Sequence, residues 1–409
     1  MEVCYPKCAG LDVHKDTVVA CVRVHGKKIE PAVRTFGTTT AELEKLAEHL
    51  AEHGVTHVAM EATGCYWKPV WTVLAADFDL ILANAAHIKN VAGRKTDVKD
   101  SAWIADLLAH GLISASFVPP SDIQALRDLT RTRKQLTRER AAHVQRIDKV
   151  LQTANVKLSS VITDITGQSG RAILNALVRG ETDPKALARL VHRNVQASPE
   201  KIAEAVHGRV DKNHRFLLKL HLDQIDGIEQ ALEQIDARIL ELMEPLEQAT
   251  KTLVSIPGVS RLSATVIISE IGTDMSRFPT AGHLISWAGL CPKNDESAGK
   301  HRSRSLRKGA PWLKTTLVQC AWAAARSKNT YLRSLFFRLK SRRGPRKAIM
   351  AVASSMLKSI YHMLKNNVAY QDLGPEHFDK VDKMRKADRL VRQLSQLGFD
   401  VQLKDKTAA

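Results

Sequence analysis

Two aspartates, Asp97 and Asp100, stand where a core-facing helix is expected to carry apolar side chains. They lie in the stretch Gly93–Gly111, GRKTDVKDSAWIADLLAHG, and a helix that begins at Asp97 turns by about 100° per residue. Both aspartates then share a stripe with four apolar residues, Trp103, Ile104, Leu107 and Leu108. Asp106 falls opposite that stripe and is expected to be a solvated surface charge. On this stretch alone, helix capping explains the pair as well as chemistry does.

Two further acids make the pair a candidate metal site. Asp12 lies between Leu11 and Val13 in a strand-like segment, where an unpaired charge would be costly, and Glu61 follows the apolar run 57–60. Four carboxylates at one edge of a sheet would form an all-oxygen site, which suits hard divalent cations such as Mg²⁺, with Mn²⁺ as the alternative. Two such ions about 4 Å apart can activate a nucleophile and stabilise a leaving oxygen in phosphoryl transfer.

The elements that would position these acids alternate between strands and helices. The hydrophobic pattern predicts strands at 9–24 (two strands joined around 14–16), 31–38, 57–60 and 80–83. It predicts helices at 39–53, 69–76 and from Asp97 onward. This order is typical of an α/β domain with a mixed sheet flanked by helices, in which the four acids can converge at one edge.

Three phrases carry a family resemblance. In this order, GLDVHK, MEATGCYW and KTDVKDSAWIADLL resemble the N-terminal RuvC-like (ribonuclease H fold) domain of the DEDD transposases of bacterial insertion sequences. That family is often called the IS one-ten group, with its IS eleven-eleven branch. The resemblance implies that Asp12, Glu61, Asp97 and Asp100 form a catalytic tetrad that binds the metal.

The charge of the chain favours a polyanionic partner. The 409 residues include 61 Lys and Arg against 43 Asp and Glu, a formal net charge of +18, which favours nucleic acid over a membrane surface. The sequence holds no apolar run of the roughly 18 residues that a membrane span needs, and its start lacks the apolar region of a signal peptide. We therefore expect a cytoplasmic, nucleoid-associated protein. The six cysteines form no CxxC pair, which argues against a zinc site or a disulfide framework.

The middle of the chain is expected to be helical. Residues 123–151 favour one helix, and between Arg127 and Lys149 it carries eight Lys and Arg against three acids. From Asp223 to Glu247 the balance reverses to eight acids and one Arg, and apolar residues recur there with coiled-coil spacing. Opposite charges predict that the two helices pair, as a hairpin or across a dimer, although a plain helical spacer is an equal alternative. In the resembled family this region is a coiled-coil arm used in assembly, which implies a homodimer or homotetramer.

The C-terminal part is expected to be a mostly α-helical domain. The turn at Pro257-Gly258 and the helix after it resemble the helix-hairpin-helix pattern, in which backbone amides meet a phosphate. A simple helix-packing turn is the competing account. Helices are also expected over 311–326, over 348–364 and once in the tail. The predicted domains are residues 1–120 (catalytic), 121–250 (coiled-coil assembly region), 251–365 (transposase domain) and 366–409 (helical tail).

A serine in this C-terminal part is the candidate nucleophile. Ser297, followed by Ala298-Gly299-Lys300, resembles the serine of the family's Ser-Gly-Gly-Lys type of loop, with Ala298 in place of the commoner glycine. Small neighbours permit close approach of DNA, and nearby cations ease loss of the hydroxyl proton. Ser303 and Ser305 are its rivals, and a serine that merely bonds a phosphate is the simpler alternative.

Two basic runs are the candidate nucleic-acid contacts. The loop after Ser297 supplies Lys300, Arg302, Arg304, Arg307 and Lys308. The densest cationic run, 333–347, includes Arg342 and Arg343 and holds aromatic residues as well, which is typical of a track for phosphates.

The resemblance spans about residues 8 to 365 and implies a transposase that cuts and rejoins DNA at element ends and target. In that family the acids of one subunit join the serine of another, the serine bonds covalently to DNA, and a bridge RNA selects target and donor. The alternative is a RuvC-like, Mg-dependent, structure-specific endonuclease that uses activated water. A non-catalytic nucleic-acid-binding protein is the third hypothesis, which charge alone would favour.

Overall fold

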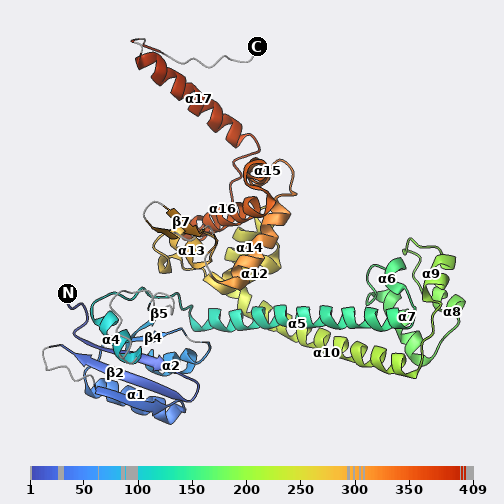
Figure 1. Cartoon of the computed structure of the whole chain (residues 1–409), viewed down its shortest axis with the longest axis horizontal. Coiled ribbons are helices and arrows are strands. Elements are labelled where there is room, and N and C mark those ends of the chain that lie inside the picture. The colour runs from blue at the N-terminus through green and yellow to red at the C-terminus, as the bar shows by residue number, and fades with distance from the viewer. Residues whose placement is uncertain are drawn as a thin grey trace. The chain divides into compact units, whose positions relative to one another are not determined.

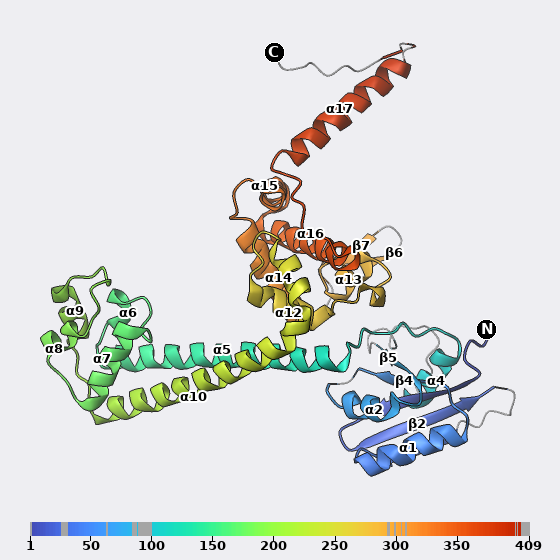
Figure 2. The ribbon, with the colours of Figure 1, turned by 180° about the vertical axis from the view of Figure 1, so that it is seen from behind.

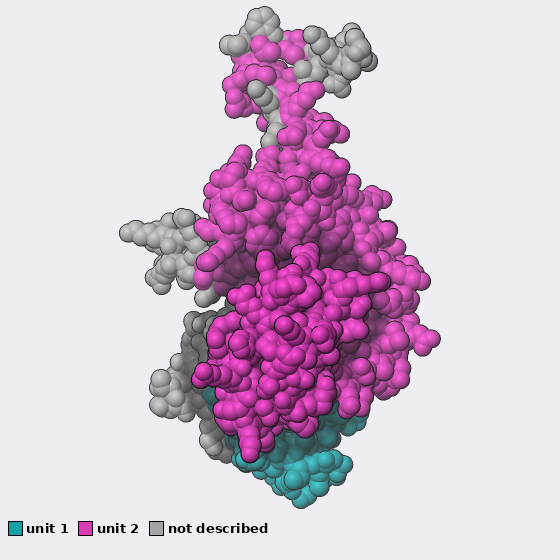
Figure 3. Space-filling model, turned by 90° about the vertical axis from the view of Figure 1, so that its right-hand side faces the viewer, with its two compact units in different colours: residues 1–118 teal, residues 119–409 magenta. Residues whose placement is uncertain are grey.

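The computed structural model describes residues 2–25, 32–62, 64–83, 88, 100–292, 295–297, 300–303, 305–306, 309–396, 398 and 400–401. The chain forms two compact units, residues 1–118 and residues 119–409, which Figure 3 shows in teal and magenta. The finer division into four domains remains a prediction.

The first unit is built on a five-stranded mixed sheet with the strand order β3-β2-β1-β4-β5 (Figure 1). Its strands are β1 (Lys7–Val13), β2 (Thr17–Val24), β3 (Ala32–Gly37), β4 (His57–Glu61) and β5 (Asp79–Ala83). β1, β2 and β3 pair antiparallel, whereas β4 runs parallel to both β1 and β5. The predicted strands are confirmed, and the mixed sheet is consistent with the expected RuvC-like α/β domain.

Helices cover both faces of this sheet. α1 (Thr40–Glu52) and α2 (Trp67–Leu74) lie on one face, and their apolar residues share a core with alternate strand residues such as Leu11 and Met60. α4 (Asp100–Ala109) lies on the other face, where it packs on Cys8 and Ala59 (Figures 1 and 2). Because successive strand residues point to opposite faces, this alternation decides which helix each strand acid can approach.

Two long helices run side by side in the second unit, as both ribbon views show (Figures 1 and 2). α5 (Ser121–Thr153) and α10 (Lys212–Met243) are joined by cross-helix ion pairs, Arg133–Asp236 at 2.5 Å and Arg140–Glu229 at 2.7 Å. The predicted pairing of opposite charges is therefore present as a hairpin within one chain. Pairing across a dimer remains a prediction.

Four short helices join α5 to α10: α6 (Leu158–Val161), α7 (Gln168–Arg179), α8 (Pro184–Arg189) and α9 (Pro199–Val206). α8 and α9 begin with Pro184 and Pro199, and a proline suits the first turn of a helix because it needs no amide hydrogen there. Their buried residues share one core with Ile147 and Leu151 of α5 and with Leu218 and Leu222 of α10.

The rest of the second unit is mostly helical around α16 (Pro345–Asn366). Its other elements are η1 (Glu244–Leu246), α11 (Glu247–Val254), α12 (Arg261–Ile271), η2 (Met275–Arg277), α13 (Ala281–Trp287), β6 (Asp295–Ser297), β7 (Lys300–Ser303), α14 (Pro311–Ala324), α15 (Tyr331–Arg343) and α17 (His377–Gln396). Val352, Met356 and Ile360 are fully buried along α16, which packs against α13, α14 and α15.

The turn between α11 and α12 is shaped by Gly258. Its φ is +87°, and a Cβ there would lie 2.5 Å from both the Ala324 nitrogen and the Cys320 carbonyl oxygen of α14. A side chain is therefore excluded, and the turn serves the packing of α12 on α14. A phosphate-binding role of the helix-hairpin-helix kind remains a prediction.

Candidate functional site

Asp12 and Glu61 end neighbouring parallel strands on the face that α4 covers. β1 and β4 are paired up to Leu11 and Met60, so Asp12 and Glu61 are the next residues of the two strands. Leu11 and Met60 belong to the core under α1 and α2. Because side chains alternate along a strand, Asp12 and Glu61 belong to the opposite face.

Gly10 brings the start of α4 onto this same face. A Cβ at Gly10 would lie only 2.3 Å from the Ala105 nitrogen and from the Ser101 carbonyl oxygen, so the helix backbone rests directly on β1. Gly10 and Asp12 are two positions apart in the strand and share a face. Asp100 is the first residue of α4 and precedes Ser101, which places it at the edge where β1 and β4 end.

The carboxylate of Asp12 is held by a neighbouring imidazole. His14 Nε2 lies 3.2 Å from Asp12 Oδ2, and the Asp12 side chain is 26% exposed. A hydrogen bond donated by the imidazole would fix the orientation of a carboxylate that remains partly open to solvent.

The donors at this edge fit a hard divalent cation by their chemistry, because Asp12, Glu61 and Asp100 offer only oxygen. Asp97 lies outside the described residues. The other three acids do not form a group whose ligand oxygens all lie within 4.8 Å of one another. Oxygens bound to one Mg²⁺ at about 2.1 Å are at most about 4.2 Å apart, so in this arrangement the three acids do not all reach a single ion.

One cluster among the described residues does meet that spacing, and it lies at the C-terminal end of α1. His49, Glu52 and His53 each offer a donor atom within 4.8 Å of the other two. His49 is 9% exposed, and burial lowers its pKa, followed by the positive charges of His53 and Arg34. These residues were not predicted from the sequence, although side chains at positions i, i+3 and i+4 of a helix are neighbours on one face.

Asp106 is an ion-pair partner on α4. Its carboxylate pairs with Arg23 of β2 and lies 3.7 Å from His110, and its side chain is 40% exposed. It therefore stays partly exposed to solvent, as predicted, and in addition pairs with Arg23, because α4 packs across β2 as well as β1. The predicted apolar stripe is confirmed, since Trp103 is 8% exposed and Ile104 is 1% exposed.

The candidate serine lies in a β-hairpin where the sequence predicted a polar loop. Ser297 is the last residue of β6 and pairs with Lys300, the first residue of β7. Arg302 and Ser303 lie within β7, and Ser303 pairs with Asp295 at the other end of the hairpin. Arg304, Arg307 and Lys308 lie outside the described residues. The choice of Ser297 over Ser303 and Ser305 remains a prediction.

Arg342 and Arg343 lie in the exposed last turn of α15. Cations earlier in this helix lie over aromatic rings: Arg338 is 5.0 Å from the ring centre of Phe378, and Lys340 is 5.6 Å from that of Phe337. The end of α15 thus carries solvent-exposed cations. Binding of nucleic-acid phosphates by these cations remains a prediction.

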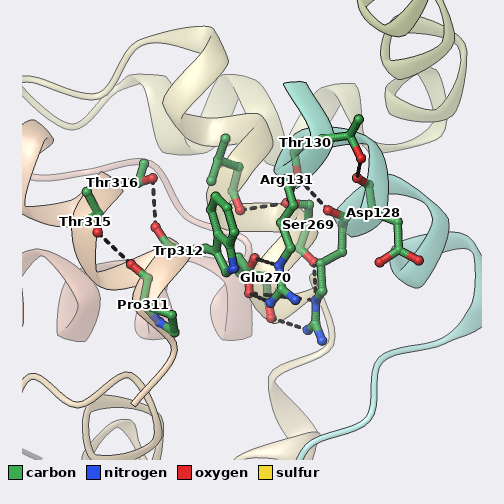
Figure 4. A network of polar contacts seen from close by, with 12 residues as sticks. Asp128, Thr130, Arg131, Ser269, Glu270, Pro311, Trp312, Thr315 and Thr316 are labelled. Carbon is green, nitrogen blue, oxygen red and sulfur yellow. Dashed lines mark hydrogen bonds and ion pairs between the residues drawn. The ribbon is translucent and has the colours of Figure 1, made fainter. Parts of the chain in front are cut away.

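A buried acid that the sequence analysis missed joins α5 to α12 (Figure 4). Glu270 is fully buried, and Arg131 donates to its two carboxylate oxygens at 2.8 and 2.9 Å. Arg127 donates to the carbonyl oxygens of Ser269 and Glu270 at 3.1 and 2.6 Å. Burial lowers the pKa of Arg127 to about 10, so the guanidinium stays charged at neutral pH. The signal in the sequence was an acid within the apolar run of α12.

Among the described residues, no helix is long and apolar enough to cross a membrane.

Two transposase families match the chain. A family described as "Transposase", of the DEDD type named for IS110, matches residues 9–156. A family described as "Transposase IS116/IS110/IS902 family" matches residues 250–336.

Curated relatives include three proteins from insertion elements or described as transposases. "Insertion element IS110 uncharacterized 43.6 kDa protein" of Streptomyces coelicolor is 25% identical over 305 residues, which is 69% of this chain and 73% of that protein. "Putative transposase y4pF/y4sB" of Sinorhizobium fredii is 20% identical over 364 residues, 87% of this chain and 84% of the relative. "Mini-circle putative transposase for IS117" of Streptomyces coelicolor is 23% identical over 291 residues, 64% of this chain and 70% of the relative.

Proposed function

Because the chain belongs to the IS110 family of transposases, we propose that it cuts and rejoins DNA with a composite site of metal-binding acids and a nucleophilic serine. The acids are Asp12, Glu61, Asp97 and Asp100, and the nucleophile is Ser297. The observation that carries the proposal is the convergence of Asp12 and Glu61 on the sheet face where Gly10 admits the start of α4.

In this proposal the acids bind the metal ion, and the serine becomes covalently attached to the cleaved DNA strand. Mg²⁺ held by the carboxylates would stabilise negative charge at the phosphate and at the leaving oxygen. The Ser297 oxygen forms a bond to a DNA phosphorus while the bond from that phosphorus to a deoxyribose oxygen breaks, and the leaving oxygen takes up a proton. Attack by another deoxyribose oxygen reverses the exchange and rejoins DNA, because the bond energy is kept in the phosphoserine ester.

Partner choice and assembly form the second part of the proposal. A bridge RNA from the element selects the target and the donor DNA, and two or four copies of the chain assemble so that the acids of one copy meet Ser297 of another. The hairpin of α5 and α10 is the assembly region in this proposal.

A denaturing gel tests the chemistry. The full chain is incubated with element-end DNA, RNA transcribed from the flank of the element and Mg²⁺, and a DNA band retarded by covalently bound protein is expected. Ser297→Ala and Asp12→Ala each abolish this adduct, whereas Ser303→Ala and Ser305→Ala, as matched controls, keep it. Normal cleavage by Ser297→Ala without any adduct would overturn the serine mechanism in favour of an endonuclease that uses activated water.

A further inference from the structure

The positive charges of α5 are only partly neutralised. Arg133 and Arg140 pair with acids of α10, and Arg131 shares the carboxylate of Glu270. Lys134 and Arg138 lie on the same helix, and among the described residues neither has a carboxylate within ion-pair distance. Among the described residues, the charges of Lys134 and Arg138 are therefore not compensated by an ion pair, although they lie beside the ion pairs of Arg131, Arg133 and Arg140.

Lys134 and Arg138, together with Arg131, lie close to one indole ring. Arg131, Lys134 and Arg138 lie 5.8, 5.8 and 5.4 Å from the ring centre of Trp312. Positions three and four apart follow one face of a helix, so this face of α5 is turned to the indole. Trp312 is half-buried and is the second residue of α14 (Figure 4). The negative face of an aromatic ring attracts nearby cations, and the attraction grows as the cations are desolvated.

The local potential at this place is positive. Burial and the charge of Arg138 lower the pKa of Lys134, and Glu270 opposes them only in part because two arginines already share it. The first turn of α14 adds to this potential, because its N-cap, Ala310, makes no side-chain hydrogen bond and leaves amide hydrogens for an acceptor. An anion bound here would relieve the repulsion between the two cations.

The helices that carry Lys134, Arg138 and Trp312 are already held in place without a ligand. The bidentate bond of Arg131 to Glu270 fixes α5 on α12, and α12 packs on α14, which carries Trp312. A site whose parts are already positioned loses little conformational entropy on binding. Lys134 and Arg138 are one helical turn apart, about 5.4 Å along the axis, so the ammonium and guanidinium groups lie on the same side of α5.

We propose that Lys134, Arg138 and Trp312 form a binding site for the phosphodiester backbone of nucleic acid, made of residues other than the four acids and the serine hairpin. Lys134 and Arg138 neutralise phosphates, and Trp312 holds the two side chains in position. The inference rests on the proposed function for the nucleic acid as ligand, but it requires no cleavage and no covalent step. DNA and RNA present the same backbone chemistry, and the test separates them.

Salt dependence of binding measures the number of phosphates that the site neutralises. The full chain is titrated into a labelled duplex DNA and, separately, into a labelled single-stranded RNA, and the logarithm of the affinity is followed against the logarithm of the salt concentration. This slope is negative. Each lost phosphate contact makes it shallower, by about 0.9 on duplex DNA and by about 0.7 on a single strand. The double variant Lys134→Gln/Arg138→Gln removes two contacts. It is therefore expected to reduce the magnitude of the slope by about 1.8 if duplex DNA occupies the site, or by about 1.4 if single-stranded RNA does.

The matched control removes two charges from the same helix. Arg133→Gln/Arg140→Gln loses the same formal charge, but these arginines are already paired with Asp236 and Glu229, so the slope should stay near that of the unmodified chain. Circular dichroism and thermal unfolding establish that each variant is folded. A slope change in the test variant that is no larger than in the control, on both DNA and RNA, would overturn the proposal.

Substitutions at Trp312 test whether the indole ring holds Lys134 and Arg138 in position. Trp312→Leu keeps both charges but removes the aromatic face, so the affinity should fall several-fold while the slope changes little, and Trp312→Phe should recover part of the loss. Equal affinities for Trp312→Leu and the unmodified chain would overturn the role of the ring. Because binding is measured without cleavage, a failure of the serine chemistry would leave these results unaffected.

Discussion

Replacing Gly10 by alanine would insert one methyl group between β1 and the backbone of α4. The added carbon would lie 2.3 Å from two backbone atoms, whereas ordinary contacts begin near 3.4 Å. Backbone atoms cannot swing aside, so α4 must retreat from β1 by about 1 Å, and overpacking of this kind costs about 1–3 kcal/mol. Asp100 moves with the helix, and a misplacement of about 1 Å at a reacting centre can cost about 10²-fold in rate.

The assay compares strand cleavage of element-end DNA in Mg²⁺ with binding of the same DNA and with thermal unfolding. Gly10→Ala should cleave about 100-fold more slowly, while DNA binding by the second unit stays close to normal. Gly227→Ala on α10 is the matched control, because a Cβ there meets nothing within 4 Å. It should leave cleavage unchanged and stabilise the helix by roughly 1 kcal/mol. Cleavage by folded Gly10→Ala at the unmodified rate would refute the placement of a catalytic acid by this contact.

Three other properties can be measured directly. Glu270→Gln leaves Arg127 and Arg131 without a counter-charge and should lower the free energy of unfolding in urea by about 3 kcal/mol. This is the lower end of the cost of breaking a buried ion pair, because the Arg131 side chain is 33% exposed. A loss below about 1 kcal/mol would contradict this expectation. Burial, then His143, lowers the pKa of His221 below its ordinary 6.5, so the unfolded chain binds protons first and the melting temperature should fall as pH drops below 6.5. His221→Gln should flatten that fall, and an unaltered pH profile would count against it. Burial raises the pKa of Cys8 to about 11, so iodoacetamide should modify exposed Cys65 much faster, as read by mass spectrometry; equal rates would contradict the burial.

The strands and helices of the first unit could be predicted because their patterns are local. β-Branched residues mark β2, and the i, i+3, i+7 spacing of Leu43, Leu46 and Leu50 before Gly54 marks α1. Placing Asp12 and Glu61 on one face needed only the alternation of strand residues. The start of α4 at Asp100 could not be read as sharply, because an aspartate favours both the cap and the first turn.

The serine hairpin escaped prediction because β6 and β7 have only three and four residues, which are polar and show no alternation. The contact of Gly10 with α4 did have a signal, since a glycine inside a strand often marks a close backbone approach. The ion pair between Arg131 and Glu270 joins residues 139 positions apart. No local pattern can foresee it, because it depends on which helices meet in the folded unit.

The length of α5 constrains how this family can change. The helix has 33 residues and spans about 50 Å. Arg131 and Arg138 make contacts in its first part, and Ile147 and Leu151 pack in a separate core near its end. Deleting one residue between these two groups would rotate one set of contacts by about 100° relative to the other, whereas deleting seven would rotate it by only about 20°. Insertions and deletions that survive in relatives should therefore come in units of about seven residues, matched in α5 and α10 together.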